Sequence, residues 1–100
     1  MLDIRKNAEN ETLTISLEGR LDTTTAPSLE AELKASLEGI TELIFDFKEL
    51  EYISSAGLRV LLSAQKTMNN QGKMIIRNVR PEIMEIFDVT GFVEILNIEE

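Results

Sequence analysis

The stretch FDFKELEYISSAGLRVLL, residues 45–62, joins an apolar strand to an amphipathic helix through a short acidic loop and two serines. The helix is expected to begin at Ser54 and Ser55. The first turn of a helix carries N–H groups without intrahelical partners and a partial positive charge, so it favours a hydroxyl cap or a phosphate. The junction predicts a strand followed by a helix and makes the two serines candidates for function.

Two further helices are predicted on either side of this junction. The first spans about 25–38, where leucines recur every four residues after Pro27 and Gly39 supplies a stop. The helix that starts at the serines is expected to bury Leu58, Leu61, Leu62 and Met68 and to end in a turn at 69–72. A third opens at Pro81, carries Ile83, Ile86 and Phe87, and closes at Gly91.

Strands alternate with these helices. Alternating apolar residues predict strands at 2–7 and 12–17, and a nearly continuous apolar run over 43–47 is typical of a central strand covered on both faces. Further strands are expected at 73–78 and 94–98. The order ββαβαβαβ indicates one α/β domain over 1–100, with a mixed sheet of four to five strands and about three main helices.

Composition excludes many functions. The chain has 100 residues, a net charge of −8, and neither cysteine nor histidine. The charge disfavours nucleic acid as a partner, and the missing side chains remove disulfides, thiolate nucleophiles, the usual zinc sites and the commonest general base. No apolar run approaches the length of a membrane span. We therefore expect a cytoplasmic protein with no membrane contact, no catalytic residues, no metal and no cofactor.

The serines have two readings. Serine is a favoured N-cap, and loss of a cap costs about 1 kcal/mol. A helix needs only one cap, however, and the small residues Ala56 and Gly57 follow where better helix formers would add stability. We therefore expect a partner to approach the backbone closely here. On this reading, Gly57→Leu abolishes partner capture and leaves the unfolding midpoint little changed.

Three segments together resemble the STAS domain of bacterial anti-sigma-factor antagonists. They are residues 45–62, GRLDTTTAPSL at 19–29, and FDVTGFVEIL at 87–96. The resemblance implies that an anti-sigma factor, which is also a serine kinase with a histidine-kinase-like ATPase fold, phosphorylates a serine at the start of the second helix and then releases the antagonist. A serine/threonine phosphatase restores the hydroxyl, after which the antagonist captures the kinase and a sigma factor is freed.

The family motif assigns the phosphate acceptor. Aligned on Gly57 and Leu58, the acceptor falls on Ser55. Ser54 stands where the family usually has aspartate, and Ala56 where it usually has a second hydroxyl residue. Serine caps a helix as aspartate does but removes a negative charge beside the acceptor, and Ser54 remains an alternative acceptor.

The resemblance also implies a partner surface. Asp22 matches an aspartate that the family places near the acceptor, although an Asx-type turn or a cap of the first helix explains it equally well. Arg59 is either a partner contact or an ordinary surface arginine. The surface that the motif and the resemblance imply comprises Asp22, Thr23, Thr24, Ser54, Ser55, Ala56, Gly57 and Arg59. We expect the protein to be a monomer or a weak dimer.

Two other functions stay open. In the first, the altered motif no longer takes phosphate and the chain is a constitutive interaction module of a signalling assembly. The second is a small hydrolase or nucleotide-using enzyme with Ser55 as nucleophile. The absence of histidine, of a glycine-rich phosphate loop and of a plausible lysine base in the motif disfavours it.

Overall fold

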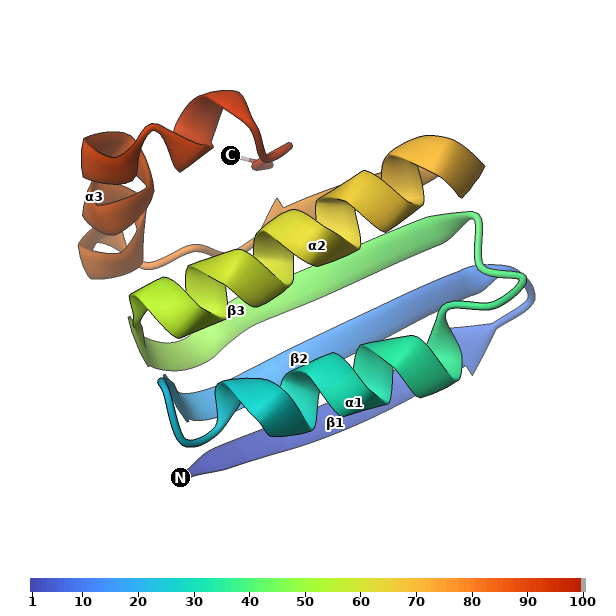
Figure 1. Ribbon diagram of the computed structural model, residues 1–100, viewed down its shortest axis with the longest axis horizontal. Helices are drawn as coiled ribbons and strands as arrows, with labels where there is room; N and C mark the ends of the chain where they lie inside the picture. Colours follow the sequence, from blue (N-terminus) through green and yellow to red (C-terminus); the bar gives the residue numbers. More distant parts are fainter. Residues whose placement is uncertain (100) are drawn as a thin grey trace.

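The computed structural model describes residues 1–99 and has two layers. Four strands form one sheet in the order β1-β2-β3-β4: β1 (Leu2–Glu9), β2 (Thr12–Leu21), β3 (Glu42–Ile53) and β4 (Lys73–Arg77). β1 pairs with β2 in antiparallel fashion, while β2, β3 and β4 run parallel. The carboxyl ends of β2 and β3 therefore meet at one edge of the sheet (Figure 1), whereas β4 pairs with β3 only as far as Asp46.

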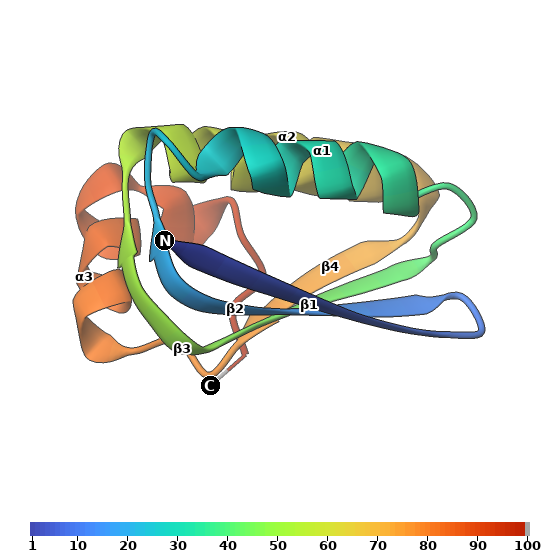
Figure 2. The same cartoon turned by 90° about the horizontal axis from the view of Figure 1, so that it is seen from below.

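The helices cover one face of the sheet. α1 (Ala26–Ser36) and α2 (Ser55–Gln71) lie side by side on it, and α3 (Pro81–Thr90) packs at the end of the sheet (Figure 2). Leu13, Ile15 and Leu17 of β2 point beneath the helices and are almost fully buried, as their alternation predicted. No helix within 1–99 is long and apolar enough to cross a membrane.

The expectation that β3 is covered on both faces is wrong. Phe45 and Phe47 are fully buried on the helix side, whereas Ile44 and Asp46 are half-buried on the other face, over which no element of residues 1–99 lies. Because Ile44 is apolar and lies between the buried Leu43 and Phe45, the sequence did not reveal that inward and outward positions alternate here. The Phe47 ring also lies 6.4 Å from that of Phe87, which anchors α3 to the sheet.

The α/β class and the element order are confirmed as far as α3, and the helix starts agree within a residue. Helix α2 extends through the expected turn to Gln71, and Leu62 is only half-buried. The last strand differs from its prediction. Gly91 adopts a left-handed conformation and leads into a 3₁₀ turn, η1 (Phe92–Glu94), so only a single bridge between Ile76 and Ile98 remains.

Candidate functional site

The site lies at the carboxyl edge of the parallel strands. Leu21 ends β2 and Ile53 ends β3, and the two residues are paired in the sheet. The Ser54 N–H donates to the Leu21 carbonyl oxygen at 2.9 Å. This bond joins the loop that begins at Asp22 to the start of α2. The two segments lie about thirty residues apart in the sequence, which is an ordinary length for a connection between parallel strands.

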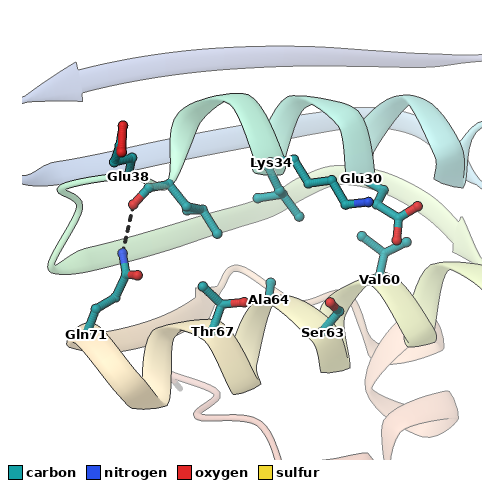
Figure 3. Close-up of a pocket in the computed structure, with 10 residues that line it drawn as sticks. Glu30, Lys34, Glu38, Val60, Ser63, Ala64, Thr67 and Gln71 are labelled. Atoms are coloured by element: carbon teal, nitrogen blue, oxygen red, sulfur yellow. Dashed lines mark hydrogen bonds between the residues drawn. The ribbon is translucent and has the colours of Figure 1, made fainter.

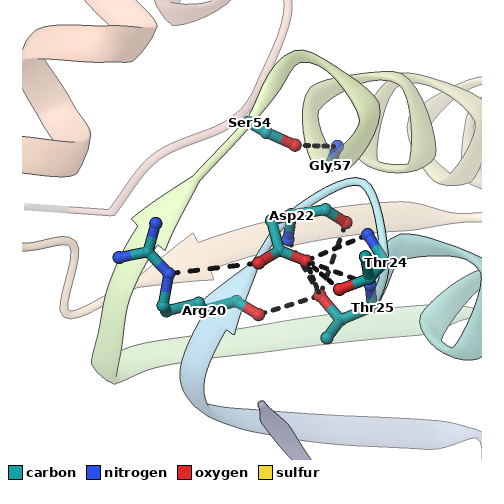
Figure 4. Close-up of polar contacts among 6 residues, drawn as sticks. All are labelled: Arg20, Asp22, Thr24, Thr25, Ser54 and Gly57. Carbon is teal, nitrogen blue, oxygen red and sulfur yellow. Dashed lines mark hydrogen bonds and ion pairs between the residues drawn. The ribbon is translucent and has the colours of Figure 1, made fainter.

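The two serines divide their roles. Ser54 has extended backbone geometry and is the N-cap of α2: its hydroxyl oxygen accepts a hydrogen bond from the Gly57 N–H at 3.4 Å (Figure 4). Ser55 is the first residue of the helix, is exposed, and its hydroxyl has no hydrogen-bond partner within residues 1–99. No general base therefore contacts Ser55 in this part of the chain, which gives the hydrolase reading no support.

Asp22 organises the neighbouring loop. Its Oδ1 accepts hydrogen bonds from the Thr24 N–H at 3.0 Å, the Thr24 hydroxyl at 2.8 Å and the Thr25 N–H at 3.1 Å (Figure 4). These donors, the Thr24 hydroxyl foremost, lower the pKa of Asp22 below its ordinary value, while partial desolvation acts in the opposite direction. The Asx-type turn expected as one reading of Asp22 is present, and it sets the path of the chain into α1.

Arg20 supports this loop from the other side. Its guanidinium lies 4.2 Å from the centre of the Tyr52 ring, and its Nε lies 3.9 Å from Asp22 Oδ2. Arg20 and Tyr52 are also paired across β2 and β3. Neither residue belongs to the predicted site. The parallel register that pairs them has no signal in the local sequence.

The reason expected for Gly57 is wrong. Gly57 is buried, and a β-carbon at this position would lie 2.7 Å from Leu21 Cγ and 2.9 Å from Ile53 Cγ1. The glycine therefore leaves room for the protein's own core, and it has no exposed side chain to offer a partner. The accompanying expectation that Gly57→Leu leaves the unfolding midpoint little changed is wrong for the same reason, because the position has no room for a β-carbon.

A hollow of about 380 Å³ brings several of the other predicted residues together. It lies between the first halves of α1 and α2, and Thr23, Ala56 and Arg59 line it with residues that the sequence analysis did not select: Ala26, Pro27, Glu30, Val60 and Ser63. Ser63 follows Arg59 by one helical turn, so helical spacing could have identified it. Ser54, Ser55, Asp22 and Thr24 do not line this hollow.

A second hollow, of about 290 Å³, continues along the same two helices (Figure 3). Glu30, Val60 and Ser63 line both hollows, so they form one groove between α1 and α2. Gln71 closes its far end by donating hydrogen bonds to the carbonyl oxygens of Leu37 at 2.7 Å and Ile40 at 2.6 Å. Among residues 1–99, no three acidic side chains gather as a metal site.

Comparisons with known proteins identify this architecture. The STAS domain model matches residues 3–100. BtrV of Bordetella bronchiseptica, which carries the name of an anti-sigma factor antagonist, is 38% identical over 81 residues that cover 79% of this chain and 70% of BtrV. The anti-sigma-B factor antagonist of Bacillus subtilis is 29% identical over 98 residues, covering 97% and 88%.

Solved structures agree on the fold. The Bacillus cell fate determinant SpoIIAA, in its phosphorylated form, superposes with a TM-score of 0.76 at 20% identity, over 98% of this chain and 92% of SpoIIAA. The two chains therefore share one fold. The match over nearly the whole sequence and the shared fold lead to one conclusion: this chain belongs to the STAS domain family.

Proposed function

We propose that this protein is an anti-sigma-factor antagonist whose binding is controlled by phosphorylation of Ser55. The observation that carries the proposal is the division of roles between the serines. Ser54 supplies the cap of α2, so the exposed Ser55 hydroxyl is not needed to hold the helix. The names of BtrV and of the B. subtilis relative support the antagonist function.

The partner is an anti-sigma factor that is also a serine kinase with a histidine-kinase-like ATPase fold. It binds the unphosphorylated edge formed by Asp22, Thr23 and Thr24 on one segment and Ser54, Ser55, Ala56 and Arg59 on the other. Captured in this way, the anti-sigma factor releases its sigma factor. A serine/threonine phosphatase returns the phosphorylated protein to the binding state.

Charge explains how a phosphate would switch binding without refolding the domain. Phosphoserine adds about −1.5 to −2 charges and three acceptor oxygens. The N-terminus of α2 accommodates an anion because its N–H groups and dipole are favourable. The same charge within a contact must be desolvated or repelled, which costs several kcal/mol when the partner surface is apolar or acidic. The solved phosphorylated form of SpoIIAA supports the tolerance of this fold for phosphate.

A constitutive module is the alternative function. Ser54 and Ala56 replace an acidic and a hydroxyl residue of the family motif, so the surface around Ser55 lacks the charge that the motif offers a kinase. In this alternative the same edge binds its partner permanently. The two functions share a surface and differ only in whether Ser55 takes phosphate.

Mass-spectrometric mapping of the protein isolated from its own cells separates these functions. The proposal expects a phosphopeptide that carries the modification on Ser55, and an anti-sigma kinase among the co-purifying proteins. Ser55→Ala should lose the phosphate and keep the partner, whereas Ser55→Asp should lose the partner. Ser54→Ala is the matched control and should still be phosphorylated. Phosphate on Ser54 alone would refute the acceptor assignment, and partner capture that is indifferent to Ser55→Asp would favour the constitutive module.

A further inference from the structure

The corner formed by α3 and η1 exposes several large apolar side chains. Val89 is 81% exposed, Val93 39% and Ile95 48%. The only other large apolar side chain that is exposed within residues 1–99 is Met1 at the amino terminus. Single exposed apolar residues are normal on a protein surface, but three within seven residues make this segment a candidate for contact with a partner.

The core does not need these residues. Ile83, Phe87 and Leu96 already face inward from the same segment and are at most 5% exposed. The left-handed Gly91 turns the chain between α3 and η1, and the two elements lie next to each other at one end of the molecule (Figure 1). The exposed set is therefore additional to the residues that hold α3 in place.

The charge around this corner is one-sided. Residues 81–100 contain six acidic residues and no lysine or arginine, whereas residues 1–80 contain twelve acidic and ten basic residues. The last fifth of the chain thus carries −6 of the net −8. The ion pairs within residues 1–99 all join side chains between Arg5 and Arg80, so none neutralises this charge.

The position of this charge works against the stability of the helix. Asp88 lies in the last turn of α3, where no basic residue is present. The carboxyl end of a helix carries a partial negative charge, so an acidic side chain there is unfavourable. Acidic residues that do not stabilise their own helix can instead serve recognition of a cationic partner.

We propose that the α3–η1 corner, which carries the exposed Val89, Val93 and Ile95 and the acidic Glu85, Asp88 and Glu94, docks a protein segment that has apolar anchors flanked by lysine or arginine. The negative charge of the corner favours a cationic segment over the other possible partners. A second copy of the chain would bring like charges together, and nucleic acid or an anionic membrane would be repelled in the same way. The inference goes beyond the proposed switch, because the corner contains none of the residues assigned to the Ser55 surface.

A displayed peptide library selected on the full-length protein tests the proposal. Peptides that are retained by the wild type but not by Val89→Ser/Ile95→Ser should combine apolar residues with flanking lysine or arginine. The best of them should bind the double variant at least about tenfold more weakly, as expected for two lost apolar contacts. Both positions are exposed, so the double variant should keep the amide NMR spectrum of a folded protein. The variant Glu85→Gln/Asp88→Asn keeps the exposed apolar residues and should bind the same peptide more weakly.

Several outcomes would overturn the proposal. Selected peptides without basic enrichment would refute the predicted charge of the partner. A selection in which no peptide distinguishes the wild type from the double variant would show that Val89 and Ile95 do not form a docking site. Shifts of amide signals at residues 54–59 rather than 85–96 would place binding on the Ser55 surface. Sedimentation that shows dimers of the wild type but monomers of Val89→Ser/Ile95→Ser would make a second copy the occupant. Ser55→Asp is the control for independence, because it should leave peptide affinity unchanged whether or not Ser55 takes phosphate.

Discussion

Gly57 shows how one residue ties the functional edge to the core. Leu21 and Ile53 end two neighbouring strands, and their side chains fill the space that a β-carbon at Gly57 would need. Gly57→Leu should lower the free energy of unfolding by about 1–3 kcal/mol, as overpacking of a buried position does. Urea denaturation measures this loss, with Ser63→Leu at an exposed position of the same helix as the control. Equal stability of the two variants would contradict the packing role.

The stability that Asp22 provides should depend on pH. Because its folded pKa is depressed, the stabilisation that its carboxylate provides is complete above the unfolded pKa of about 4 and is lost as the pH falls through the folded value. The stability difference between the wild type and Asp22→Asn should therefore shrink on acidification. Thermal melts across this range measure it, with Asp3→Asn at an exposed position of β1 as the control. A difference that stays constant in acid would show that the carboxylate charge is not what matters.

Helix α2 allows its two serines to be separated by stability. Ser54→Ala should lower the free energy of unfolding by about 0.5–1 kcal/mol, since it removes a cap whose hydrogen bond is long, at 3.4 Å. Ser55→Ala should change it little, because the Ser55 hydroxyl contributes no hydrogen bond within the described residues. The two variants differ only in position and are measured side by side by chemical denaturation. A larger loss for Ser55→Ala would reverse the roles assigned to the serines.

Helices and strands were predictable where their apolar residues recur at a regular spacing. The alternation of Leu13, Ile15 and Leu17 and the four-residue spacing of the leucines in α1 each depend on one neighbouring layer, so they appear directly in the sequence. The end of the chain was less predictable. Residues 94–98 are apolar enough for a strand, but the turn at Gly91 sets Phe92–Glu94 into a 3₁₀ turn, which no local period announces.

At the scale of the whole molecule, contacts between distant segments limited the prediction of the site. The serine junction was found from its own residues and the Asp22 loop from the family resemblance, and the parallel register of β2 and β3 brings the two segments together. That register also places Leu21 against Gly57 and Arg20 against Tyr52. These contacts depend on how two strands are aligned, so local sequence gave Gly57 a role outside the core and gave Arg20 and Tyr52 none.

The whole fold should be indifferent to a negative charge at Ser55. The side chain is exposed at the favourable end of a 17-residue helix, and the helix is held through the buried face of α2 and the cap at Ser54. Ser55→Asp should therefore keep the amide NMR spectrum apart from signals near the substitution, and it should raise stability by at most about 1 kcal/mol through the helix dipole. Ser55→Asn, of similar size and without charge, is the control. Signal changes spread over the sheet would mean that charge at this position acts by rearranging the domain, and the switch would then need a conformational mechanism in place of direct repulsion at the surface.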